Sequence, residues 1–170
     1  MTLETQTTSI ITLRPVVPGD YDFLVEVYAS TRADEMAMVP WTDDQRQAFV
    51  RSQFNAQQDH YGQKYPTANH DVILSNERQV GRLYVARLEK EIRIVDLTLL
   101  PTERNNGIGS YLLKQLIEES GAKGKVTRIY VEDFNPSLNL FKRLGFNVTA
   151  QEGFHLLLEH TSATTTDSVG

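Results

Sequence analysis

An arginine and two glycines stand at the spacing Arg104-x-x-Gly107-x-Gly109, directly after an apolar segment that ends at Pro101. An amphipathic helix is expected after Gly107. Glycine has no Cβ, so a ligand can approach the backbone closely at this point. The first N–H groups of a helix lack partners within it and lie at the positive end of its dipole, which favours a phosphate or pyrophosphate. The spacing therefore predicts a phosphorylated cofactor, with a tight strand-to-helix turn that binds nothing as the alternative.

A second motif stands one predicted strand and one predicted helix further along the chain. It begins with Asn135 in the triplet Asn-Pro-Ser, continues through Phe141 and Gly145, and ends at Phe146. Taken alone, it is typical of a helix capped by Asn135, with proline at its first position and a glycine stop. Together and in this order, the two motifs resemble those of the GNAT superfamily of N-acetyltransferases, which bind acetyl-CoA. They are similar to its pyrophosphate loop and its Asn-Pro-Ser…Tyr-x-x-Leu-Gly-Phe helix, and the order of elements matches along roughly residues 9–160.

The resemblance implies how the cofactor is held. In this family the strand before the pyrophosphate loop separates from its neighbour, and the thioester lies in the gap. Leu97 and Leu99 would bind the pantetheine arm through their backbone, and an amide near Leu99 or Leu100 would polarise the thioester carbonyl. Arg104 would screen the pyrophosphate, and Asn135 would contact the pantetheine or cap its helix. The pyrophosphate itself would accept from the amides of Asn105, Asn106, Gly107, Ile108, Gly109 and Ser110.

Phe141 departs from the family pattern, which usually has tyrosine at this position with the role of protonating the departing CoA thiolate. Phenylalanine has no proton to give, although its flat ring could pack beside the cofactor arm. A thiol with a pKa of about 8.5 is a fair leaving group near neutrality. Water or another hydroxyl such as Tyr130 could therefore serve, and a non-catalytic acyl-CoA-binding module is the alternative function.

Asp96 is the first candidate for the general base that an amine acceptor needs. Strand alternation predicts Asp96 on the same face as Ile94, where an acid is unexpected unless it faces a cleft or has a partner. The alternative for Asp96 is a buried ion pair with Arg82 or Arg93. Glu132, at the end of the next predicted strand, is the second candidate, with a surface charge as its alternative.

Candidate acceptor-binding side chains precede the predicted meander of strands. Met38 and Trp41 belong to an apolar loop in a region that often covers the acceptor site in this family; packing of the loop on the core is the alternative. Tyr61 and Tyr65 are predicted to border the same cleft, with a surface cluster as the alternative.

Composition narrows the class of protein. The chain has 170 residues, a net charge of −5 and no cysteine, and its four histidines are scattered. The charge makes nucleic acid or an anionic membrane an unexpected partner and favours a cationic or amine-bearing acceptor. Because the chain has no cysteine, we expect no disulfide and no thiolate nucleophile, and the histidines lack the spacing of metal ligands, so we expect no metal site. Since no Ser-His pair stands out either, direct attack by the amine is expected. No signal peptide or membrane-spanning run is recognisable, so a cytoplasmic location is expected.

The elements predict one α/β domain over residues 9–160, with disordered ends at 1–8 and 161–170. We expect helices after Asp20, after a capping box formed by Thr42 and Gln45, after Gly107 and after Asn135. Strands are predicted at residues 10–16, 72–75, 80–88, 92–100, 126–132, 146–150 and 154–159. The resemblance implies a mixed, mostly antiparallel twisted sheet of six to seven strands with helices on both faces. The predicted function is acetyl transfer from acetyl-CoA to a primary amine of a small molecule or peptide, and the apolar C-terminal hairpin leaves a homodimer open.

Overall fold

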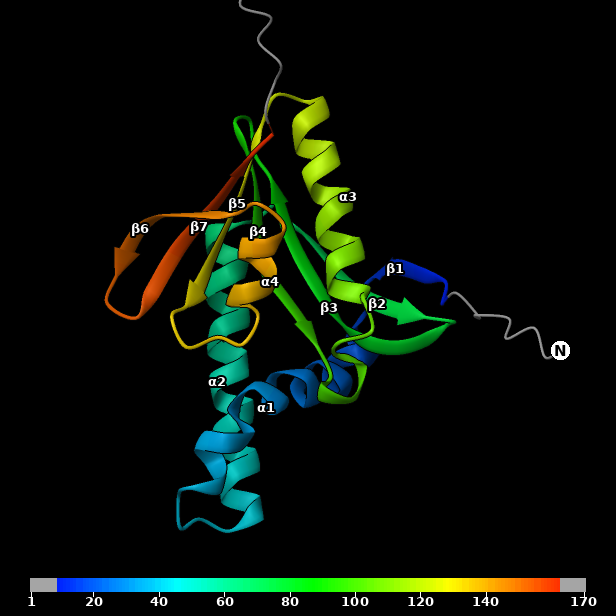
Figure 1. Cartoon of the computed structure of the whole chain (residues 1–170). Coiled ribbons are helices and arrows are strands. Elements are labelled where there is room, and N and C mark those ends of the chain that lie inside the picture. The colour runs from blue at the N-terminus through cyan, green and yellow to red at the C-terminus, as the bar shows by residue number, and fades with distance from the viewer. Residues whose placement is uncertain (1–8, 163–170) are drawn as a thin grey trace, which may run out of the picture.

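The computed structural model describes residues 9–162, which form a seven-stranded sheet with helices on both faces (Figure 1). The strand order is β1-β2-β3-β4-β5-β7-β6, and every pair of neighbours is antiparallel except β4 and β5. The strands are β1 (Ile11–Pro15), β2 (Asn69–Ser75), β3 (Arg78–Arg87), β4 (Glu91–Leu99), β5 (Val126–Glu132), β6 (Asn147–Glu152) and β7 (His155–Thr161). The helices are α1 (Tyr21–Ala37), α2 (Asp43–Lys64), α3 (Ile108–Ala122) and α4 (Leu138–Arg143). The predicted fold class is confirmed.

The chain ends bear on the predicted domain limits. Residues 1–8 and 163–170 lie outside the described range, and so does nearly all of the disorder predicted for the two ends. Thr161, the first residue of the predicted tail, is the last residue of β7. Among the helices of residues 9–162, none is both long and apolar enough to cross a membrane.

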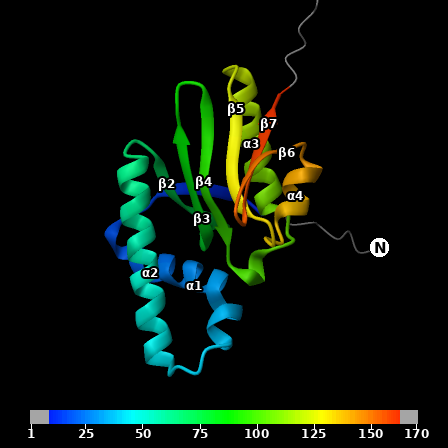
Figure 2. The ribbon, with the colours of Figure 1, turned by 90° about the vertical axis from the view of Figure 1, so that its left-hand side faces the viewer.

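The main core lies between the sheet and α3. The helix has apolar residues at a spacing of three and four, and Ile108, Leu112, Leu113 and Leu116 are all buried on its inner side. They pack on buried residues of β3, β4, β5 and β7, among them Ile94 and Leu158. Figure 2 shows α3 and α4 on one side of the sheet and α1 and α2 on the other.

The opposite layer is a long hairpin of α1 and α2 with its own small core, which includes Tyr28, Val50 and Phe54. The predicted capping box is confirmed: the Thr42 side chain accepts from the Gln45 amide, and the Gln45 side chain accepts from the Thr42 amide.

Asp20 stands at the N-cap position of α1, but the prediction that its side chain caps the helix is wrong. The Asp20 carboxylate accepts two hydrogen bonds of 2.8 Å from the Arg14 guanidinium and one from the Val17 amide. Because an ion pair with arginine outcompetes a neutral amide, the carboxylate ties β1 to the start of α1 instead. The Arg14 guanidinium lowers the pKa of Asp20 from 3.8 to about 2.

A β-bulge in β4 reverses the predicted alternation. Tyr84 pairs with Asp96 and Val85 pairs with Ile94, so Val95 is an extra residue in the ladder. An extra residue turns every later side chain to the other face of the sheet. The prediction that Ile94 and Asp96 share a face is therefore wrong: Ile94 lies in the core beneath α3, whereas Asp96 faces α2.

The same point in β4 is where the sheet opens. The parallel pairing of β4 with β5 runs only from Glu91 to Ile94 on β4, opposite residues 126–129 of β5. Beyond it, β4 continues to Leu99 and β5 to Glu132 without pairing to each other. The two strands therefore diverge, leaving the backbone of β4 unpaired on one side.

Candidate functional site

The turn that enters α3 presents a run of main-chain N–H groups. Gly107 has a φ of 81°, a conformation that glycine adopts without strain, and the first helical hydrogen bond runs from the Tyr111 amide to the Gly107 carbonyl. The amides of residues 105–110 donate to no other residue within 9–162. Six donors at the positive end of a 15-residue helix can hold a diphosphate.

Neighbouring side chains hold this turn in place. Glu103 is buried and forms an ion pair of 2.9 Å with Arg78 of β3. Arg104 is exposed, and its Nε lies 3.4 Å from the Leu99 carbonyl. A Cβ on Gly109 would make only ordinary contacts, 3.6 Å from a Leu140 methyl, so packing within the protein does not require glycine there. Any need for glycine at 109 would come from a ligand.

The unpaired edge of β4 leads away from this turn. The Leu100 amide donates to the Val80 carbonyl at 2.9 Å, which continues the ladder between β3 and β4. Residues of an antiparallel strand direct their backbone groups alternately to the two sides, so those of Leu97 and Leu99 point into the gap beside β5. Of the two amides proposed for the thioester carbonyl, Leu99 is therefore the free one, and Leu100 is occupied.

A cleft of about 450 Å³ lies between the α1–α2 layer and the diverging strands. It brings together side chains predicted from distant parts of the sequence, both the candidate bases and candidate contacts of cofactor and acceptor. The predicted residues that line it are Tyr61, Tyr65, Asp96, Leu97, Glu132, Asn135 and Phe141. The last residue of β4, Leu99, and the next residue, Leu100, lie further along the chain, and residues 104–110 follow at the entrance to α3.

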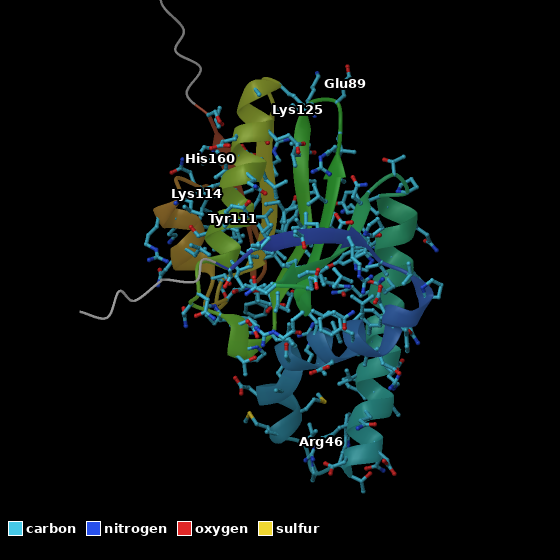
Figure 3. The ribbon with its side chains drawn as sticks, turned by 90° about the vertical axis from the view of Figure 1, so that its right-hand side faces the viewer. Arg46, Glu89, Tyr111, Lys114, Lys125 and His160 are labelled. Carbon is cyan, nitrogen blue, oxygen red and sulfur yellow. The ribbon has the colours of Figure 1, made fainter. Side chains whose placement is uncertain are left out.

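Met38 and Trp41 lie outside this cleft. They belong to the loop between α1 and α2, at the end of the hairpin that points away from the sheet (Figure 1). Met38 is 87% exposed, and Trp41 packs edge-on against Phe49 with ring centroids 5.2 Å apart. Arg46, labelled in Figure 3, closes the loop by donating to the Met36 carbonyl at the end of α1 and to the Val39 carbonyl in the loop. The length of the two helices carries these residues away from the cleft.

Asp96 has the ion pair that was its alternative interpretation. Its Oδ2 accepts from Arg82 Nε at 2.6 Å, and its Oδ1 accepts from the Thr98 hydroxyl at 2.9 Å. Arg82 is 1% exposed, and its two remaining nitrogens donate to the side chains of Gln57 and Gln58 on α2. Asp96 itself keeps 22% of its side chain exposed at the cleft. The carboxylate is therefore both held from below and open to a ligand.

Aromatic groups beneath α2 surround this ion pair. Burial raises the pKa of Tyr61 to about 12, and the charge of Asp96 adds to the effect, so the hydroxyl keeps its proton. Tyr61 packs edge-on against Tyr84, and His70 stacks on Tyr84 with ring centroids 4.4 Å apart. Burial lowers the pKa of His70 to about 4, so this imidazole is neutral.

The segment that carries Asn135 and Phe141 completes the wall of the cleft. Asn135 Oδ1 accepts from the Ser137 amide at 2.8 Å, and α4 begins at Leu138, two residues later than predicted. Phe141 is buried and packs against Phe146 with centroids 5.4 Å apart. Tyr130, the alternative source of a hydroxyl, is 43% exposed in the same cleft.

The sequence did not predict that α2 contacts the Arg82–Asp96 pair through two glutamines. Gln57 and Gln58 stand in a polar stretch of the helix with nothing to distinguish them from solvated residues. Arg82 carried a usable signal, because it is the single charge in the run 80–86 that is otherwise apolar or aromatic. A lone cation in such a strand requires a buried partner.

Comparison with known proteins agrees with this geometry. Residues 30–146 match the Acetyltransferase (GNAT) family, and the chain belongs to that family. No curated protein sequence matches the chain significantly. Several solved structures share the fold at low sequence identity.

One of these is the PaiA N-acetyltransferase of Thermoplasma acidophilum in complex with coenzyme A, at 18% identity and a TM-score of 0.67, covering 89% of this chain and 99% of its own. The ribosomal-protein-S18-alanine N-acetyltransferase of Escherichia coli aligns at 14% identity and a TM-score of 0.61, covering 95% and 99%. Arabidopsis thaliana Naa50, in complex with the bisubstrate analogue CoA-Ac-MVNAL, aligns at 16% identity and a TM-score of 0.59, covering 89% and 98%.

Proposed function

We propose that the protein is an N-acetyltransferase that moves an acetyl group from acetyl-CoA to a primary amine. The observation that carries this proposal is the continuity of three features. Unpaired amides at residues 105–110 lead to the edge of β4 at Leu97 and Leu99, which pairs with no strand there, and this edge borders a cleft that holds a carboxylate. A diphosphate, a pantetheine arm and an amine would occupy them in that order.

The reaction needs no covalent enzyme intermediate. The amine nitrogen attacks the thioester carbonyl carbon, the carbon–sulfur bond breaks, and coenzyme A leaves as the thiolate. The Leu99 amide, free of the β3–β4 ladder, would donate to the oxygen that becomes negative in this step. Protein-family membership and CoA complexes of similar folds support this assignment.

The proton of the amine would pass to Asp96, directly or through water. Asp96 faces the cleft as a carboxylate fixed by Arg82, with lone pairs still free to accept from the substrate. Glu132 lines the same cleft at the end of β5 and is the second candidate base. Asp96→Asn should lower kcat by about 10²–10⁴-fold and change its pH profile, whereas Glu132→Gln should change neither. The opposite result would assign the base to Glu132.

Phe141 supports one rival, a non-catalytic acyl-CoA-binding module, because a buried phenyl ring stands where the family usually has tyrosine. Both candidates should bind acetyl-CoA, as measured by calorimetry, and both should bind less tightly after Gly107→Val, which strains the helix entrance. Only the enzyme should release free CoA when amines are added. Phe141→Tyr places a hydroxyl at the cleft; a faster rate would show that a missing acid was limiting.

Other sequence predictions stay predictions. These are the domain limits at residues 9 and 160, the cytoplasmic location, the homodimer and the independence from metal ions. Calorimetry that detects no uptake of acetyl-CoA or CoA by the folded full chain would refute the proposed function.

A further inference from the structure

The sign of the charge inside the cleft is opposite to that of the whole chain. The chain has a net charge of −5. Among the described residues that line the cleft, the cations are Arg32, Lys64, Arg82 and Arg93, and the only anions are Asp96 and Glu132. A cleft with low-dielectric walls concentrates the field of its own charges, so a substrate responds to the local sign more than to the total.

After Arg82, which is bound to Asp96, Arg93 is the least exposed of these cations. Its Nε and Nη2 donate to Glu91 at 3.2 and 3.1 Å, and its guanidinium lies 4.9 Å from the ring centroid of Tyr130. The side chain is only 12% exposed, yet no described residue accepts from Nη1. Arg93 therefore presents a rigid donor at the cleft, which costs little side-chain entropy on binding.

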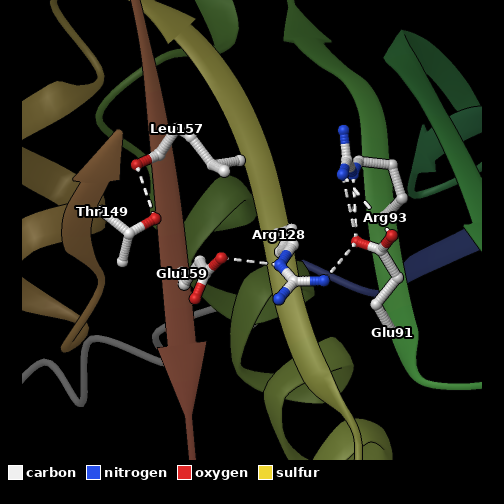
Figure 4. A network of polar contacts seen from close by, with 6 residues as sticks. All are labelled: Glu91, Arg93, Arg128, Thr149, Leu157 and Glu159. Carbon is white, nitrogen blue, oxygen red and sulfur yellow. Dashed lines mark hydrogen bonds and ion pairs between the residues drawn. The ribbon is translucent and has the colours of Figure 1, made fainter. Parts of the chain in front are cut away.

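Glu91 contacts a second arginine besides Arg93, so its negative charge is divided between two cations. Figure 4 shows Glu91 between Arg93 and Arg128, with Arg128 also bonded to Glu159. Arg128 lies 3.4 Å from Glu91 but does not line the cleft. Both arginines thus contact Glu91, but of the two only Arg93 lines the cleft.

Two further cations approach from the helical layer. Arg32 of α1 is oriented by the Tyr28 hydroxyl and by Glu35, whose side chain is mostly exposed and outside the cleft. Lys64 ends α2, with its Nζ 5.5 Å from the ring centroid of Tyr65. Cations from α1, α2 and β4 therefore surround the space that Asp96 reaches from below.

We infer that the acceptor is an amine that also carries an oxyanion, a carboxylate or a phosphate. A simple protonated amine is repelled by this lining, since the only carboxylates it meets are Asp96 and Glu132, and Asp96 is already paired with Arg82. An acceptor with both groups places its amine at Asp96 and its anion at Arg93, with Arg32 and Lys64 adding attraction. The inference rests on the proposed function and specifies its substrate class.

The test compares acceptors that differ only in the anion, using the full chain and acetyl-CoA. β-Alanine is paired with β-alaninamide, and O-phosphoethanolamine with ethanolamine; the two pairs distinguish a carboxylate from a phosphate. We expect kcat/KM to be at least about 10-fold higher for one acceptor that carries the anion than for its partner, whose only charge is the ammonium group. Rising salt should reduce this preference, because ions screen the attraction.

Variants assign the preference to the cleft. Arg93→Gln should raise KM about 10-fold for the acceptor that carries the anion, with little change in kcat. It should not raise KM for the partner that lacks the anion, because the guanidinium repels that acceptor. Arg128→Gln is the matched control, because it removes a guanidinium from the same carboxylate without touching the cleft. If Arg93→Gln does not fold, Arg32→Gln at the more exposed α1 site should show the same selective loss.

Binding separates failure of the inference from failure of the proposed function. Calorimetry of β-alanine and of O-phosphoethanolamine with CoA-loaded protein reads the anion site without turnover. Anion-selective binding that Arg93→Gln abolishes supports the inference, even if no amine is acetylated. The absence of acetylation would count against the proposed enzymatic function instead. Acceptors without the anion that bind and react as well as their partners with it overturn the inference and leave the acetyltransferase intact. Equal loss for both kinds of acceptor in Arg93→Gln has the same consequence.

Discussion

Removing either partner of the Arg82–Asp96 pair should cost stability, but by unequal amounts. Arg82 is 1% exposed, whereas Asp96 keeps 22% of its side chain at the cleft. Asp96→Ala leaves a buried guanidinium with only the amide oxygens of Gln57 and Gln58 as acceptors. Arg82→Met leaves a carboxylate that still accepts from Thr98 and that cleft water can solvate.

The magnitudes follow from burial. An uncompensated buried charge costs about 3–5 kcal/mol, so we expect Asp96→Ala to lower the free energy of unfolding by about 4 kcal/mol. Arg82→Met loses a charge-assisted hydrogen bond of 2.6 Å, but water can hydrate the remaining Asp96 carboxylate. We therefore expect this variant to lower the free energy of unfolding by about 2 kcal/mol. For a chain of this size each kcal/mol lowers Tm by about 2–4 °C, so the two variants should differ by about 4–8 °C.

Urea unfolding followed by far-ultraviolet circular dichroism measures both free energies and the double variant. Because each single change already breaks the pair, the double variant should be less destabilised than the sum of the singles by about 1–2 kcal/mol. Arg82→Met costing as much as Asp96→Ala, or strictly additive effects, would refute the argument. Either result would mean that water solvates the ion pair and that burial does not determine its contribution to stability.

Three further predictions concern pH and backbone packing. Asp20 has a pKa of about 2 when folded against 3.8 when unfolded, so its stabilisation is complete above about pH 4 and is lost as the pH falls toward 2; Asp20→Asn should be less stable than the parent protein at neutral pH, with the difference closing in acid. His70 has a folded pKa of about 4 against 6.5, so between these values only the unfolded chain binds the proton and stability falls as the pH decreases; His70→Gln should flatten the urea midpoint across that range. A Cβ on Gly81 would collide with the Thr98 carbonyl oxygen, so Gly81→Ala should cost about 1–3 kcal/mol and weaken acetyl-CoA binding along β4. The control Gly62→Ala, in open space on α2, should instead stabilise by about 0.5–1 kcal/mol in the same urea assay.

Local features of the structure could be predicted from the sequence because they depend on residues a few positions apart. The capping box of Thr42 and Gln45 is one example, since both partners lie within one turn. The entrance to α3 is another, because a left-handed φ at Gly107 and the missing helical partners of the next amides are properties of that short segment. The order of strands and helices, and with it the family, followed from such features.

The chemistry around Asp96 could not be predicted in the same way. One extra residue, Val95, turned the side chain to the other face of the sheet, and a bulge depends on how β3 and β4 pair rather than on either strand alone. The sequence left both Arg82 and Arg93 as possible partners of Asp96. The register of the strands places Arg82 against Asp96, whereas Arg93 pairs with Glu91.

The sequence by itself thus determined which elements form and which backbone groups a phosphorylated ligand would meet. Only the tertiary structure decided where β4 and β5 part, which side chains share the cleft, and that its lining is cationic in an acidic chain. The physical reason is that local backbone preferences act within a turn or a strand. Register, burial and charge neighbourhoods arise only when segments far apart in the chain are packed against one another.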